Sequence, residues 1–138
     1  MITEDYVSFE VAKLLKEKGF DGKCHSHYYP CHYPDGSIQY HKYESSVKGD
    51  KCWYDVYSLK TLPVDHYLAP TLQIAMKWLR EVHCLTIDIF HYRDWKVTIK
   101  TIPNDYLKAD YSNDELKPSE TYEQACEAAI KYCLENLV

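Results

Sequence analysis

The second half of the chain, residues 69–138, constrains the fold most strongly, because it contains a bounded helix, a tight β-hairpin and a second helix in succession. Pro70-Thr71 opens the first helix with Thr71 as the cap, and a second helix begins at a capping box, Thr121 to Gln124. Residues 84–91 and 95–102 alternate apolar and polar side chains around a turn at Tyr92-Arg93-Asp94. The predicted apolar faces are Leu72, Ala75, Met76, Leu79 and Val82 on the first helix, flanked by Ile74 and Trp78; Leu85, Ile87, Ile89, Trp95, Val97 and Ile99 on the hairpin; and Ala125, Ala128, Ala129, Tyr132 and Leu137 on the last helix. We expect this αββα segment to build the hydrophobic core.

The first half is less regular. Val7, Val11, Leu14 and Leu15 predict a helix from about Thr3 or Ser8 to Lys18, which Gly19 would terminate. Three strands are predicted over residues 23–29, 37–43 and 52–59, with Pro30 and Pro34 as interruptions, a turn at Pro34-Asp35-Gly36 and a polar loop over residues 45–51. Residues 103–118 are expected to form a polar connection, with a short strand near Tyr106 or Tyr111. Together these elements predict one α+β domain, with an antiparallel sheet of about four to six strands and about three helices mainly on one face.

Charge, hydropathy and cysteine content make several classes of protein less favoured. The net charge is −5, which disfavours general nucleic-acid binding, although sixteen basic residues leave room for a local patch. No apolar run approaches the roughly 18 residues that cross a bilayer, so no membrane partner is predicted. The N-terminus lacks the features of a signal peptide, and we expect a cytoplasmic protein with reduced thiols. Among the six cysteines, Cys126 and Cys133 lie on a predicted helix, where we expect small buried hydrophobes rather than part of a disulfide framework.

Tyrosine is over-represented, with 14 copies. Tyrosine favours strands, so a tyrosine-rich sheet is the simplest interpretation. Aromatic side chains are also enriched at interfaces, which makes the same residues a candidate recognition surface. The candidate residues for partner or ligand binding are Tyr28, Tyr29, Tyr40 and Tyr43, with Lys77, Arg80 and Lys96, joined by Lys100, as a mild basic patch. Such a patch beside tyrosines would suit a small anionic, nucleotide-like ligand, although solvated surface charge is the ordinary explanation.

Residues 24–32 concentrate histidine and cysteine. His25, His27, Cys31 and His32 are candidate metal ligands, because imidazole and thiolate are the ligands that zinc prefers. The spacing matches no standard zinc motif, and exposed polar residues on an irregular hairpin would give the same pattern. The sequence contains no P-loop, GxGxxG, GxSxG or HExxH motif, and we predict no catalytic residue.

The segment Thr71-Leu72-Gln73-Ile74-Ala75-Met76-Lys77-Trp78-Leu79-Arg80-Glu81-Val82-His83, the hairpin after it and the helix from Thr121 to Ala129 resemble small uncharacterised proteins encoded by gut Bacteroidales and their phages and mobile elements. The opening residues 2–15 are also similar, so that the resemblance covers about two thirds of the chain. It implies a phage or mobile-element origin and carries over no active site.

The leading hypothesis is therefore a non-catalytic binding or interaction protein, oligomeric, that binds a protein partner or itself. Two alternatives stay open. The first is a protein that sequesters a small anionic ligand, and the second is a metal-binding enzyme that uses the histidine- and cysteine-rich segment of residues 24–33. No cofactor is predicted beyond the zinc alternative.

Overall fold

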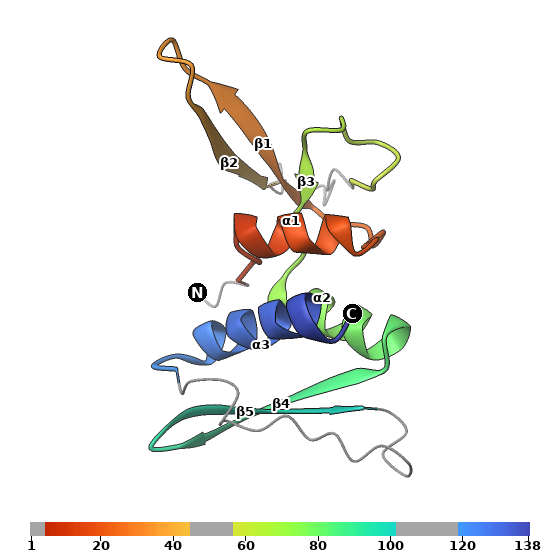
Figure 1. The fold of residues 1–138 in the computed structure, drawn as a ribbon, viewed down its shortest axis with the longest axis vertical. Coiled ribbons are helices and arrows are strands. Elements are labelled where there is room, and N and C mark those ends of the chain that lie inside the picture. The colour runs from red at the N-terminus through yellow and green to blue at the C-terminus, as the bar shows by residue number, and fades with distance from the viewer. Residues whose placement is uncertain (1–4, 45–56, 102–118) are drawn as a thin grey trace, which may run out of the picture. The chain divides into compact units, whose positions relative to one another are not determined.

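The computed structural model describes residues 5–44, 57–101 and 119–138. Over these residues the chain has three helices and five strands, and the strands form one three-stranded and one two-stranded antiparallel sheet (Figure 1). The predicted α+β class is confirmed, with the strands divided between two small sheets. The chain also divides into two compact units, Tyr6–Pro70 and Thr71–Val138 together with residues 1–5. The expectation of a single domain stays a prediction.

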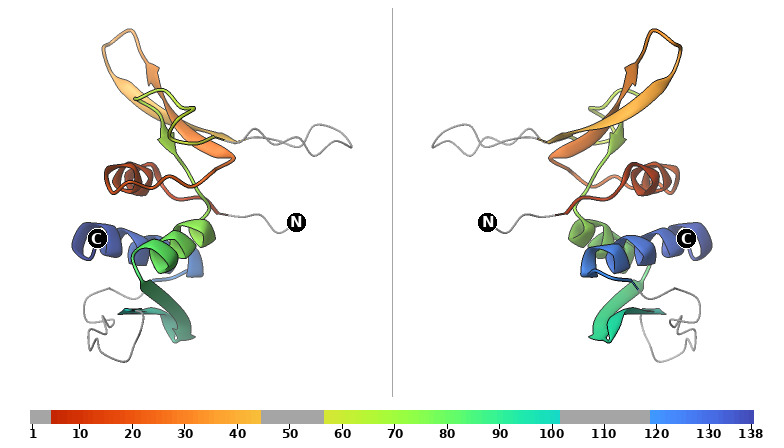
Figure 2. Two further views of the ribbon diagram at one scale, coloured as in Figure 1. Left: turned by 90° about the vertical axis from the view of Figure 1, so that its right-hand side faces the viewer. Right: turned by 90° about the vertical axis from the view of Figure 1, so that its left-hand side faces the viewer.

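The unit formed by Thr71–Val138 contains α2 (Leu72–Val82), β4 (Leu85–Tyr92), β5 (Asp94–Thr101) and α3 (Tyr122–Asn136). Both predicted caps are confirmed, because Thr71 Oγ1 accepts the Ile74 N–H at 3.2 Å and Thr121 Oγ1 accepts the Gln124 N–H at 3.1 Å. Helices α2 and α3 pack together on one face of the β4–β5 hairpin (Figures 1 and 2).

The predicted hairpin register is also confirmed. Ile87 pairs with Ile99 and Ile89 with Val97, so the apolar residues of both strands share one face. Val97 and Ile99 are buried, whereas Phe90 on the opposite face is 43% exposed. Residue 102, the predicted end of the second strand, lies outside the described residues.

The apolar stripe of α2 is partly different from the prediction. Val82 was expected in the core but is 58% exposed, whereas Trp78 was expected at its flank and is buried. Val82 is the last residue of α2, and burial needs an opposing neighbour as well as helical spacing. On α3, Ala125 and Ala129 are buried as predicted, and Ala128, Tyr132 and Leu137 are half-buried. The α3 core also includes Cys126, Ile130, Cys133 and Leu134, which confirms the two cysteines as buried residues.

The unit formed by Tyr6–Pro70 begins with α1 (Phe9–Glu17). Its cap is Ser8, the later of the two predicted starts, whose side chain accepts the Val11 N–H at 3.3 Å. Gly19 has a φ of +87°, and the bonds Gly19 N–H to Lys16 O and Phe20 N–H to Leu15 O form a Schellman motif. The predicted role of Gly19 as the helix terminator is confirmed.

The sheet of this unit has the order β2–β1–β3, with β1 Ser26–His32, β2 Ile38–Glu44 and β3 Tyr67–Leu68. The turn between β1 and β2 is at Pro34-Asp35-Gly36 as predicted, and Asp35 Oδ1 accepts the Ser37 N–H at 2.9 Å. The prediction that Pro30 interrupts the first strand is wrong, because Pro30 lies within β1 opposite Tyr40. Strand β3 pairs only with His27 and Tyr28, so the nitrogen of Pro30 faces no strand and the missing N–H costs no ladder bond.

The third predicted strand lies mostly outside the described residues. Tyr57 forms a single bridge with Cys24, and residues 59–61 form a turn, so the strand does not continue to Leu59. The short strand β3 was not predicted. The predicted loops at residues 45–51 and 103–118 lie outside the described residues.

Candidate interaction surface

The β1–β2 hairpin sets the two faces and the edge of the sheet in the Tyr6–Pro70 unit. The Tyr33 N–H donates to the Ser37 carbonyl at 3.0 Å, so residues 33 and 37 form a hydrogen-bonded pair at the end of the hairpin. Hydrogen-bonded pairs therefore recur at every second position of the ladder: residue 31 with 39, 29 with 41, and 27 with 43. Opposed residues share a face. The histidine face consists of His27, Tyr29, Cys31, Gln39, His41 and Tyr43. The helix face consists of Ser26, Tyr28, Pro30, His32, Ile38, Tyr40, Lys42 and Glu44.

Two of the candidate tyrosines pack α1 onto the helix face. The Tyr40 ring stacks on the Phe9 ring with 4.2 Å between centroids, and the rings of Tyr28 and Tyr67 contact Phe9 edge-on at 5.6 and 5.3 Å. Tyr28 also donates its hydroxyl to the Val7 carbonyl at 2.7 Å. Tyr28 and Tyr40 therefore stabilise the fold of this unit by aromatic packing.

The other two candidate tyrosines lie on the histidine face, around His27. The His27 ring contacts the Tyr57 ring edge-on at 4.4 Å and stacks with the His66 ring at 5.3 Å, and Tyr43 and Tyr29 complete its surroundings. His27 is only 8% exposed, and neither its Nδ1 nor that of His66 has a hydrogen-bond partner in the described structure. Burial, and secondarily the nearby His66, lowers the pKa of His27. The predicted tyrosine surface is thus divided between two faces of one sheet.

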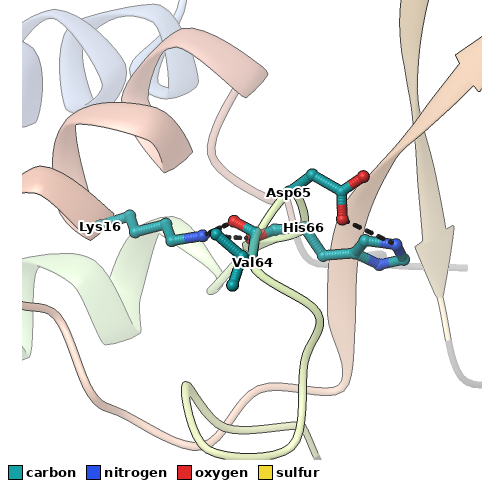
Figure 3. Close-up of polar contacts among 4 residues, drawn as sticks. All are labelled: Lys16, Val64, Asp65 and His66. Carbon is teal, nitrogen blue, oxygen red and sulfur yellow. Dashed lines mark hydrogen bonds and ion pairs between the residues drawn. The ribbon is translucent and has the colours of Figure 1, made fainter.

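Lys16 of α1 binds the turn before β3, which includes His66. The Lys16 ammonium donates to the carbonyls of Val64 and His66, the second at 3.0 Å (Figure 3). It also lies 4.7 Å from the centroid of the Tyr67 ring. The Asp65 carboxylate lies 3.8 Å from His66 Nε2 (Figure 3). Lys16 therefore fixes the approach to β3 and with it the position of the His66 ring.

The candidate metal ligands do not come together. His25 precedes β1 and is exposed, His27 and Cys31 share the histidine face four residues apart, and His32 is on the helix face. Among the described residues, no group of three or more histidine, cysteine or acidic side chains could hold a metal ion. Zinc binding stays a prediction without a ligand set in this part of the chain.

The candidate basic residues are also separated from one another. Lys77 and Arg80 are exposed on α2, which packs on the apolar face of the β4–β5 hairpin. Lys96 is on the opposite face of that hairpin, paired with Phe90 and 5.2 Å above the Tyr92 ring. The three charges do not form one patch within this unit.

Sequence reasoning missed Phe9, Tyr57, His66 and Tyr67 as parts of these clusters. His27 and Tyr29, and likewise His41 and Tyr43, are two residues apart, and residues at this spacing in a strand share a face. Together with the turn at Pro34-Asp35-Gly36, this spacing could have assigned the histidine face from the sequence. No local pattern indicates that Tyr57 and His66 lie beside His27, because those contacts are set by long-range packing.

Strand β2 is the most exposed of the three strands of this sheet. Because 39, 41 and 43 bond to β1, the backbone groups of Ile38, Tyr40, Lys42 and Glu44 point away from it. Strand β2 is at the end of the strand order, and no strand pairs with its outer edge within residues 5–44, 57–101 and 119–138. Six of its seven residues are exposed.

No family model matches the chain, and neither a curated protein nor a solved structure shows significant similarity to it. The resemblance to proteins of gut Bacteroidales, phages and mobile elements stays a prediction. No helix within the described part of the chain has the length and apolar character needed to cross a membrane.

Proposed function

We propose that this protein is a non-catalytic interaction protein that accepts a partner strand along the outer edge of β2. The observation that carries the proposal is the outer edge of β2, which no strand of the described residues pairs with. It is a run of seven ladder positions in which every second residue directs its N–H and carbonyl outward. Such an edge is a ready template for strand addition by another polypeptide, with affinity from main-chain hydrogen bonds.

Two of the usual protections of an edge strand, a proline and a β-bulge, are absent from residues 38–44. All seven residues pair with β1 in one continuous register without a bulge, and the strand contains no proline. Lys42 would block an edge if its side chain extended outward. Instead its ammonium lies 2.7 Å from the Glu44 carboxylate and 4.7 Å from the centroid of the Tyr6 ring, so the side chain lies along the helix face.

The experiment compares Ile38→Pro with Ile38→Thr. Ile38 is the first residue of β2, 50% exposed, and its N–H points outward, so proline removes one donor from the edge and no bond to β1. The threonine variant loses the same apolar side chain but keeps the N–H. We expect self-association in sedimentation velocity, or capture of a specific partner from host extract, to weaken in Ile38→Pro and persist in Ile38→Thr. Equal association by both variants would refute the proposal, as would a wild-type protein that is monomeric and captures no partner sensitive to the proline.

A further inference from the structure

A second copy of the chain presents a strand of the same seven residues, with the same outward-pointing backbone groups. We infer that two β2 strands pair antiparallel across a twofold axis at His41 and join the two three-stranded sheets into one. This inference rests on the proposed function, since it needs the β2 edge to be the binding surface.

Backbone geometry restricts the registers. Only outward-pointing residues can exchange hydrogen bonds, so each bonded pair must join two members of the set Ile38, Tyr40, Lys42 and Glu44. In a twofold antiparallel pair, a residue opposes its partner at equal distance from the axis. An axis at His41 pairs all seven residues of both strands, with Ile38 bonded to Glu44 of the second copy and Tyr40 bonded to Lys42 of the second copy.

Charge selects the same register. An axis at Lys42 would place two ammonium groups directly opposite each other, which is destabilising across strands. An axis at Tyr40 would leave Tyr43 and Glu44 without opposed residues. With the axis at His41 no like charges oppose, and each Lys42 faces a tyrosine ring, the kind of partner it already has in Tyr6.

The histidine faces of both copies then become continuous. His41 opposes His41 of the second copy as a non-bonded pair, and Gln39 opposes Tyr43 of the second copy. Tyr43, which is 44% exposed, and Ile38, which is 50% exposed, both lose solvent contact in this arrangement. Tyr33, whose hydroxyl lies 3.1 Å from His41 Nε2, and Tyr29, whose ring centroid lies 6.2 Å from that of His41, would flank the axis.

Two matched substitutions at Ile38 test the register. In the proposed dimer, Ile38→Lys places an ammonium opposite Glu44 of the second copy, twice by symmetry, and should lower the dimer Kd roughly fivefold relative to Ile38→Thr, which loses the same apolar side chain. Ile38→Glu opposes two carboxylates at the same sites and should raise it by a similar factor. A register centred on Tyr40 reverses both signs, because Ile38 then opposes Lys42, and that result would overturn the inference.

A cross-link tests the axis. Cα atoms of a non-bonded antiparallel pair are about 4.5 Å apart, within the range of about 4.4–6.8 Å that a disulfide spans. Under mild oxidation, His41→Cys should give a covalent dimer on non-reducing gels well above the wild-type background, with peptide mapping placing the link between the two copies of position 41. Gln39→Cys is the control, since its sulfur would face Tyr43 of the second copy and lie far from its own symmetry mate. Both variants are made in a Cys31→Ser background, because Cys31 opposes position 39 within the hairpin and could bond to it. Equal cross-linking of both variants would overturn the inferred axis.

The outcomes separate this inference from the proposed function. A wild-type protein that stays monomeric up to about 1 mM, but binds a foreign partner lost in Ile38→Pro, refutes the dimer and retains the edge as a binding surface. A dimer that is unchanged by Ile38→Pro, Ile38→Lys and Ile38→Glu, together with no captured partner that is lost in Ile38→Pro, refutes both.

Discussion

Cys84 adopts a backbone conformation that disfavours any residue with a Cβ. It directly follows His83, the C-cap of α2, and has a φ of +57° before the chain enters β4. Gly19 holds the equivalent position after α1, with a φ of +87°. A Cβ in the left-handed region costs about 1–2 kcal/mol, and glycine loses about 0.5–1 kcal/mol more conformational entropy on folding. Because the Cys84 side chain is exposed, its loss removes little packing.

We therefore expect Cys84→Gly to stabilise the protein by about 0.5–1 kcal/mol and to raise Tm by about 2–4 °C. The assay is urea and thermal unfolding followed by circular dichroism under reducing conditions. Cys84→Ala is the matched control, since it removes the thiol but retains the Cβ, and it should remain within about 0.5 kcal/mol of wild type. If the glycine variant is no more stable than the alanine variant, the argument from backbone strain is refuted.

Three other predictions can be tested by unfolding measurements or by labelling of cysteine thiols. Gly19→Ala should destabilise by about 1 kcal/mol in urea, and an unchanged midpoint would contradict the Schellman cap. Because the pKa of His27 is lowered in the folded state, the unfolded chain binds more protons as the pH falls below about 6.5. Stability should decrease in that window, and His27→Gln should reduce this pH dependence more than His32→Gln does. Burial raises the pKa of the Cys133 thiol to about 12, so a thiol reagent should modify exposed Cys84 at once and Cys133 only on unfolding; rapid labelling of Cys133 in the native protein would contradict its burial.

The candidate interaction surface was predictable only in part. The tyrosines of β1 and β2 and the histidines of β1 are candidates from the sequence, and the turn between the two strands is predicted correctly, but His41 of β2 is not among the candidates. Side chains alternate between the two faces along a strand, which divides these residues into two sets. Which residues belong to the strand at all depends on where the strand begins. The first predicted strand begins at residue 23 and includes His25, whereas β1 begins at Ser26 and leaves His25 outside it.

Local sequence determined the elements whose signals lie within a few residues. The caps at Thr71 and Thr121, the helix terminator Gly19 and the alternation of β4 and β5 depend on hydrogen bonds and side-chain directions between near neighbours. These interactions are the same in any fold that contains the segment, so the sequence alone was sufficient.

Tertiary structure decided the features that depend on which segments meet. The two-residue strand β3 exists because its backbone pairs with β1, and His66 becomes a neighbour of His27 because Lys16 binds the turn before β3. The free edge of β2 likewise follows from the strand order rather than from its residues. Contacts between residues far apart in the chain depend on loop closure and packing, which leave no periodic pattern in the sequence.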